Sequence, residues 1–235
     1  MALADLIGWT ATLVGAVLGL PQLVRLTRTR DVRGLSFLAW RSTLVLNLIW
    51  LAHGLRIDQS PQVVTNVIAL SITLPLVILL ARSLRRSVTM ALLPSIAVAG
   101  VIVAIDHTLG SLVFGAAAVL PAIFANTGQS IELVRSHTVS GVAPLFLMLA
   151  CLNQSLWLTW AVLIHDPGTI LAASLTLTMT SFNLGWFLLR RAGLRPLFVQ
   201  PLPEPALPSP TQSSDEASRV LPARTEAAAA LHELR

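Results

Sequence analysis

Long apolar stretches follow one another along most of the chain, separated by short polar segments. Such stretches are typical of membrane-spanning helices, because a helix needs about 20 mostly apolar residues to cross the hydrocarbon core of a bilayer. We expect seven spans, near residues 5–26, 36–55, 62–81, 88–105, 109–134, 144–164 and 168–189. The pattern therefore predicts an all-α membrane protein with seven transmembrane helices.

The pattern also occurs twice. When residues 6–55 are moved forward by 107 positions, many of them meet an identical residue. The matches include Gly8 with Gly115, Gln22 with Gln129, Arg28 with Arg135, Gly34 with Gly141 and Trp50 with Trp157. A bias toward Leu and Ala does not place Gly, Gln, Arg and Trp at the same intervals. The chain therefore contains two copies of one unit, an organisation that many membrane transporters share.

Each copy holds three spans, so two copies joined directly would face opposite ways. The fourth span has no counterpart in the repeat, and by returning the chain to its starting side it makes the two units parallel. The expected domains are a first triple-helix repeat at 1–86, a linker transmembrane helix at 87–107, a second triple-helix repeat at 108–191 and a disordered cytoplasmic tail at 192–235. The tail is rich in Pro, Ser and Glu, which do not form a packed core.

Composition supports the membrane assignment, and charge orients the spans. Only 11% of the residues are charged, whereas soluble domains contain about 25%. Arginines gather after the first, third, fifth and seventh spans, while Arg56 is the one arginine of the opposite loops. The positive-inside rule then predicts a multi-pass plasma-membrane protein with its N-terminus outside and its C-terminus in the cytoplasm. The net charge of +5 is explained by these membrane flanks, so we expect no nucleic-acid partner.

Residues 19–40 read GLPQLVRLTRTRDVRGLSFLAW, with Pro21 and Gln22 at the end of a span, a basic loop, and Gly34 before the next span. This segment resembles the PQ-loop superfamily. Together with the duplicated plan of three, one and three spans, it makes residues 6–191 similar to the bacterial SWEET and SemiSWEET sugar facilitators. The resemblance implies two triple-helix bundles around a central route, each with its helices in the spatial order first, third, second.

The resemblance also implies a sugar site lined by a Trp on the second helix of a bundle and an Asn on the third. Trp50 and Asn66 match this pair in the first copy. In the second copy Trp157 matches, but positions 172–174 read Ala-Ala-Ser, so the Asn is missing. We therefore expect an asymmetrical site.

Helical geometry adds further candidates. On an ideal helix Thr43, Asn47, Trp50 and His53 share one face of the second span, and the sixth span repeats this with Asn153, Gln154 and Trp157. Amide and hydroxyl groups bond sugar hydroxyls, and an indole face stacks on the C–H face of a pyranose. The expected substrate-binding residues are Trp50, Asn66, Asn47, His53, Trp157, Asn153 and Gln154. The alternatives are an aromatic belt for the tryptophans, helix-to-helix bonds for the amides and simple packing for His53.

Pro21 is a candidate hinge. It removes one helical hydrogen bond and clashes with the carbonyl one turn earlier, so the first span can bend there. Gln22 can satisfy the backbone groups that such a bend frees, and Gln129 stands at its place in the second copy. We expect these three residues to act in gating, with a static kink as the alternative.

What the sequence lacks narrows the function. It has no Walker loop, no metal-binding cluster and no nucleophile–base pair, so we expect no enzyme, cofactor or metal. No acidic residue lies near the middle of a span, which disfavours proton coupling. The expected function is a facilitator, a uniporter for a small neutral solute such as a mono- or disaccharide, working by alternating access. The alternatives are a proton-coupled amino-acid transporter of the PQ-loop type and a non-transporting receptor or assembly factor. The expected partners are the solute and the lipid bilayer, and a homo-oligomer is compatible with the sequence.

Overall fold

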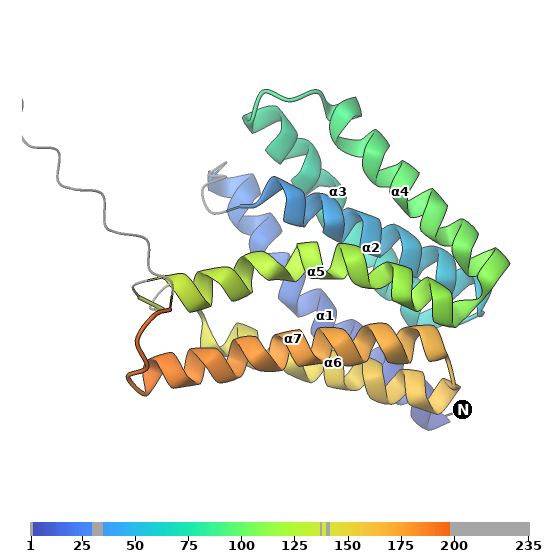
Figure 1. Ribbon diagram of the computed structural model, residues 1–235. Helices are drawn as coiled ribbons and strands as arrows, with labels where there is room; N and C mark the ends of the chain where they lie inside the picture. Colours follow the sequence, from blue (N-terminus) through green and yellow to red (C-terminus); the bar gives the residue numbers. More distant parts are fainter. Residues whose placement is uncertain (1, 30–34, 137, 140–141, 198–235) are drawn as a thin grey trace, which may run out of the picture. The chain divides into compact units, whose positions relative to one another are not determined.

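The computed structural model describes residues 2–29, 35–136, 138–139 and 142–197. These residues form helices and no strand, as predicted (Figure 1). The helices are α1 (Ala2–Thr29), α2 (Phe37–Arg56), α3 (Ser60–Ser83), α4 (Val88–Leu109), α5 (Ser111–Arg135), α6 (Pro144–Ile164) and α7 (Pro167–Arg191). The length of each helix differs from that of its predicted span by at most six residues, with α5 one residue shorter and the others equal or longer. Most of the predicted tail, at 198–235, lies outside the described residues.

Local sequence signals fix where these helices begin. Ser36 and Ser87 cap α2 and α4, since each hydroxyl accepts a hydrogen bond from the backbone N–H three residues later. Asp166 caps α7 in the same way, accepting from the Thr169 backbone N–H at 2.9 Å. Gly110, with φ of 86°, separates α4 from α5 and allows the sharp turn between them.

Within each repeat the first helix contacts the third, and the third contacts the second. In the first repeat α1 packs on α3 and α3 on α2, and in the second repeat α5 packs on α7 and α7 on α6. Among the residues the structure describes, α1 does not touch α2 and α5 does not touch α6. The predicted order of first, third, second helix is therefore confirmed in both bundles.

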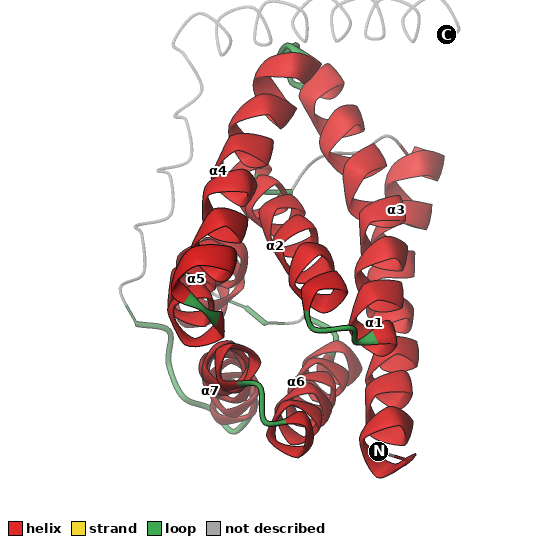
Figure 2. Cartoon of the chain, turned by 90° about the vertical axis from the view of Figure 1, so that its right-hand side faces the viewer, coloured by secondary structure: helices red, strands yellow, loops and turns green. Residues whose placement is uncertain are grey.

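Contacts between the repeats are reciprocal. Helix α1 packs on α6 of the second repeat, and its counterpart α5 packs on α2 of the first (Figure 2). Such an exchange is what a twofold rotation of parallel units produces. The linker α4 contacts α2, α5 and α3, and it shares a core with α2 and α5 that includes Ile49, Ile102 and Phe114. The linker is therefore packed against both repeats.

Equivalent glycines let the first helix of each repeat approach the start of the third. A Cβ added at Gly8 would lie 2.9 Å from Pro61 Cβ. A Cβ added at Gly115 would overlap the backbone of Gly168. These pairs occupy the same places in the two copies, because both are separated by 107 positions. The sequence repeat is therefore also a repeat in packing.

Five helices, α3 to α7, are long and apolar enough to cross a membrane. In α1 the segment Ala2–Leu18 forms a shorter apolar helix. Helix α2 is not among these five, because Arg41, Asn47 and His53 lower its mean hydropathy. Its polar groups face protein instead, since Arg41 donates to Ser95 and Asn47 donates to Thr73. The chain is an all-α, multi-pass membrane protein in which α2 lies against α3, α4 and α5.

Candidate functional site

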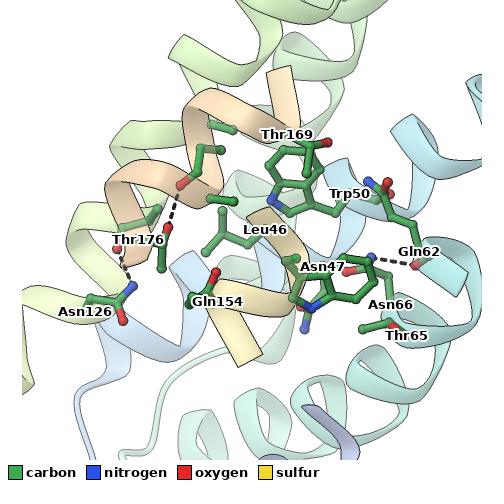
Figure 3. Close-up of a pocket in the computed structure, with 15 residues that line it drawn as sticks. Leu46, Asn47, Trp50, Gln62, Thr65, Asn66, Asn126, Gln154, Thr169 and Thr176 are labelled. Carbon is green, nitrogen blue, oxygen red and sulfur yellow. Dashed lines mark hydrogen bonds between the residues drawn. The ribbon is translucent and has the colours of Figure 1, made fainter. Parts of the chain in front are cut away.

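A cavity of about 260 Å³ lies between the two repeats. It is bounded by side chains of α2, α3, α5, α6 and α7, and Figure 3 shows its polar groups converging from these helices. The residues that line it are uncharged: Leu46, Asn47, Trp50, Gln62, Thr65, Asn66, Ala118, Ala122, Asn126, Gln154, Trp157, Thr169, Ala172, Ala173 and Thr176. A partly enclosed space with amides, hydroxyls and indoles but no charge fits a neutral polar solute.

Each repeat contributes one tryptophan to the cavity, and each ring is held by another ring. Trp50 makes edge contacts with His53 and Phe114, at centroid distances of 5.6 and 5.0 Å. Trp157 makes an edge contact with Trp160 at 5.2 Å. Because edge-to-face contacts of this kind restrain ring orientation, both indoles are positioned before any solute enters.

The third helix of the first repeat supplies a row of amides. Asn66 donates to the Gln62 carbonyl at 2.8 Å, and Gln62 donates to the Trp50 carbonyl at 3.3 Å (Figure 3). The Gln62 Oε1 atom is buried and accepts no hydrogen bond from the described part of the chain. A buried acceptor without a donor is costly, so this amide is an incompletely satisfied group next to the cavity wall.

The second repeat is less polar at the corresponding place. Ala173, which takes the position of Asn66 in the repeat, lines the cavity with Ala172. Asn126 on α5 and Thr176 on α7 supply polar groups elsewhere, and both donate to carbonyls of their own helices. The cavity is therefore asymmetrical in the way the missing Asn predicts.

Five of the seven predicted binding residues line this cavity, namely Trp50, Asn66, Asn47, Trp157 and Gln154. The other two do not. His53 is fully buried between the Phe114 ring and two carboxylates, and Asn153 lies beside Gly15 of α1. Each residue lies on the polar face of its helix. A neighbouring helix packs against that part of the face, so neither side chain lines the cavity.

Sequence reasoning missed five polar lining residues: Gln62, Thr65, Asn126, Thr169 and Thr176. A signal existed on α3, where Gln62 and Thr65 fall on the Asn66 side of the helix at helical spacing. It also existed on α7, where Thr169 and Thr176 lie two turns apart. Asn126 had no such partner, and only the packing of α5 identifies it.

The hinge residues remain a prediction. Position 21 lies within α1, but the side chains of Pro21 and Gln22 are outside the described residues. Gln129 is half-buried on α5. Helix α5 also contains Pro121, so both first helices hold a proline that removes one backbone donor.

A buried cluster of charged groups lies next to the cavity. The two ring nitrogens of His53 face carboxylates, with Nδ1 2.7 Å from Asp106 Oδ2 and Nε2 3.0 Å from Asp166 Oδ2. Thr169, which lines the cavity, donates to Asp166. Burial raises the pKa of Asp166, but hydrogen bonds from His53, Ser111 and Thr169 outweigh this and hold it below its ordinary value.

The sequence did not predict this cluster. It indicated that no acidic residue lies near the middle of a span, and the cavity lining is indeed free of carboxylates. Asp106 lies in the last turn of α4 and Asp166 just before α7. The fold brings both to His53, and through Thr169 to the wall of the cavity.

Comparison with known proteins agrees with this architecture. Residues 3–63 match the family model for the PQ loop repeat. The structure of a eukaryotic SWEET transporter is similar, with a TM-score of 0.64 and 15% sequence identity, over 81% of this chain and 100% of that chain. No curated protein matches the sequence. Residues 3–63 therefore match a PQ loop repeat, and the described residues have a SWEET-like fold of seven helices.

Proposed function

We propose that the protein is a membrane transporter for a small neutral solute, with sugars as the substrate class. The observation that supports this most is the uncharged cavity between the repeats, lined by one tryptophan from each of them. A charged substrate such as an amino acid would need opposite charges in the wall, because a desolvated ion without a partner is very costly. A sugar needs what the wall offers, which is hydrogen-bonding groups and aromatic faces.

The size of the cavity narrows the proposal from mono- or disaccharides toward the smaller class. Its volume is about 260 Å³, whereas ligand pockets commonly measure about 300–1,000 Å³. Asn66 and Gln62 offer amide groups on one side, and the indoles of Trp50 and Trp157 offer apolar faces. A single pyranose ring uses both kinds of contact, so a monosaccharide is the preferred candidate.

The proposed mechanism is alternating access without an ion gradient. The repeats touch through two reciprocal pairs, α1 with α6 and α2 with α5, on either side of the cavity. A tilt of one repeat against the other would open one end while the opposite end stays closed. We propose an N-terminus outside and a cytoplasmic C-terminus in the plasma membrane, and a topology reporter fused after residue 195 tests this orientation.

Reconstitution tests the function directly. The purified protein in liposomes is screened for uptake of labelled monosaccharides, disaccharides and amino acids, with empty liposomes and Trp50→Ala as controls. We expect a monosaccharide to enter until its concentrations are equal on both sides, with the same final level whether or not a pH gradient is imposed. Failure of every sugar to enter, with flux of another solute, would overturn the proposed substrate class.

A second candidate is a proton-coupled amino-acid transporter. The buried contacts of His53 with Asp106 and Asp166 favour it, since titratable groups inside a membrane protein often mark proton sites. Its signature in the same screen would be accumulation of an amino acid above the outside concentration when a pH gradient is present.

A further inference from the structure

His53 joins three parts of the chain at one end of the bundle. It lies on α2 of the first repeat, Asp106 lies on the linker α4, and Asp166 precedes α7 of the second repeat. All three are buried, with exposed fractions of 0%, 2% and 7%. The contact between His53 Nε2 and Asp166 is therefore a direct polar link between the two repeats.

Counting hydrogens shows that this arrangement needs an extra proton. A neutral imidazole has one N–H, and its other nitrogen is an acceptor. In this cluster both nitrogens stand within 3.0 Å of a carboxylate oxygen, and an oxygen that carries no hydrogen would repel the bare nitrogen. Arg56 Nη2 also lies 3.4 Å from His53 Nδ1, but Asp106 Oδ2 is much closer to that nitrogen, at 2.7 Å, and this short contact still needs a hydrogen between the two atoms. Two hydrogens are required for the two hydrogen bonds to carboxylates, so the second must reside on the ring or on one of the carboxyl groups.

The charge balance gives the same result. Arg56 also belongs to the cluster, because its Nε donates to Asp106 Oδ2 at 2.8 Å. With the extra proton the charges of Arg56, His53, Asp106 and Asp166 sum to zero, and without it they sum to minus one. The described charged residues of α3, α5 and α7 lie in the last turn of each helix, which is the end far from this cluster. A buried net charge is unfavourable, so the closed cluster retains the proton.

His53 and Asp106 are shielded from water, whereas Arg56 at the edge of the cluster is exposed. Phe114 of α5 stacks on the His53 ring with a centroid distance of 4.4 Å and an interplanar angle of 12°. Asp106 Oδ1 is buried and has no hydrogen-bond partner among the residues described. The carboxylate of Asp106 is thus incompletely satisfied by the protein, which adds to the cost of leaving it fully charged.

We propose that Asp106, His53 and Asp166 form a one-proton binding site whose occupancy holds the two repeats together at this end of the molecule. Separation of the repeats breaks the His53–Asp166 contact and admits water, after which the second hydrogen is no longer needed. The proton then leaves to the medium on the same side and is taken up again from that side on closure. The consequence for transport rests on the proposed function. Transport rates should depend on pH, but the solute should not accumulate, because the proton is released and taken up on the same side.

The linkage has a definite sign. The closed state binds one more proton than the open state, so acid favours closure and the preference is lost as the pH rises. Since one proton is involved, the ratio of open to closed molecules changes by at most about tenfold per pH unit. The counterpart of His53 in the second repeat is Trp160, which has a fixed N–H and cannot titrate in this range.

The test measures separation of the repeats without any solute, so its outcome does not depend on the proposed function. Spin labels are placed at Ser60, at the start of α3, and Leu163, near the end of α6, in a Cys151→Ser background. Both sites are exposed. Distances are measured by pulsed electron paramagnetic resonance in lipid nanodiscs between pH 5 and 9. We expect a short distance at low pH and a growing longer-distance population as the pH rises.

Three variants and one control decide the origin of the effect. His53→Gln, Asp106→Asn and Asp166→Asn should each abolish the pH dependence, because each removes the need for the second hydrogen. His107→Gln changes an exposed histidine next to Asp106 and should leave it intact. Each variant is first checked for a monodisperse elution profile, as evidence that it folds. One folded variant is enough to test the proposal. A pH-independent distance distribution in the unmodified cluster, or pH dependence that survives in a folded variant, would overturn the proposal.

Discussion

In the first repeat the residue one turn after the cavity tryptophan is His53, and in the second repeat it is Trp160. Both are fully buried, and both make an edge contact with that tryptophan, at interplanar angles of 84° and 89°. Trp160 lies against Gly8, whereas His53 bonds two carboxylates. The two copies thus share this ring packing, but only the first places a titratable imidazole there.

A second difference separates the copies inside the cavity. Asn66 of α3 presents an amide where Ala173 of α7 presents a methyl group. The two tryptophans, in contrast, are retained at equivalent positions. The comparison teaches that the apolar contacts of the site are shared between the repeats, while its hydrogen bonding at this position comes from the first repeat.

The largest expected effect concerns packing that both repeats share. In Gly115→Ala the new methyl group would meet the Gly168 backbone, which cannot move aside, whereas in Gly8→Ala it meets Trp160 Nε1 at 2.8 Å and Pro61 Cβ at 2.9 Å. Overpacking costs about 1–3 kcal/mol, and more where backbone must shift. We expect Gly115→Ala to lower the unfolding temperature in detergent more than Gly8→Ala does.

The matched control for this comparison is Gly128→Ala, because a Cβ there would meet nothing within 4 Å. It should unfold at or slightly above the temperature of the parent protein, since Ala favours a helix. Equal unfolding temperatures for Gly115→Ala and Gly128→Ala would contradict the close approach of α5 and α7.

The next effect tests what the repeats have in common at the cavity. Trp50→Ala and Trp157→Ala each remove an indole that lines it, and with it the stacking area for a sugar ring. Losing about 1.4 kcal/mol of binding corresponds to a tenfold change, and we expect each variant to reduce sugar flux in liposomes by at least about that factor. Trp9→Ala is the control, because Trp9 is exposed on α1 and does not line this cavity. Flux unchanged in both cavity variants would place the route elsewhere.

A smaller effect is expected at the predicted hinge. Pro21→Ala restores a backbone donor in α1 and should stiffen it, so turnover should fall severalfold while the solute dissociation constant stays the same. Stopped-flow exchange in liposomes and equilibrium binding measure the two quantities separately. An unchanged turnover would make Pro21 a static kink.

The sequence predicted the helices, their duplication and the position of Trp50, Asn66 and Trp157. It could do so because apolar length, repeated spacing and a matching pair of residues are local properties of the chain. It did not predict the partners of His53, because Asp106 and Asp166 stand 53 and 113 positions away and lie at span ends. Acidic residues at span ends are normally read as parts of loops, and only the packing of α4 and α7 on α2 and α5 buries them.

The cavity was predictable only where one helix face contains several polar residues. Asn47 and Trp50 lie three positions apart on α2, and both line the cavity. His53 and Asn153 belong to similar faces, but their exposure to the cavity depends on whether Phe114 or α1 covers them. Tertiary packing decides which residues a neighbouring helix covers, so the residue pattern of a single helix does not predict it.

The central claim is that one cavity between unequal repeats binds the solute, and paired binding measurements test it most directly. Asn66→Ala removes an amide from the wall, whereas Ser174→Ala changes a nearby residue of the second repeat that does not line the cavity. A hydrogen bond of this kind contributes about 0.5–1.5 kcal/mol, or roughly a twofold to twelvefold change in affinity. In isothermal titration of the purified protein, the account predicts that Asn66→Ala raises the sugar dissociation constant by such a factor and that Ser174→Ala leaves it unchanged. Equal, small effects of the two substitutions would contradict it.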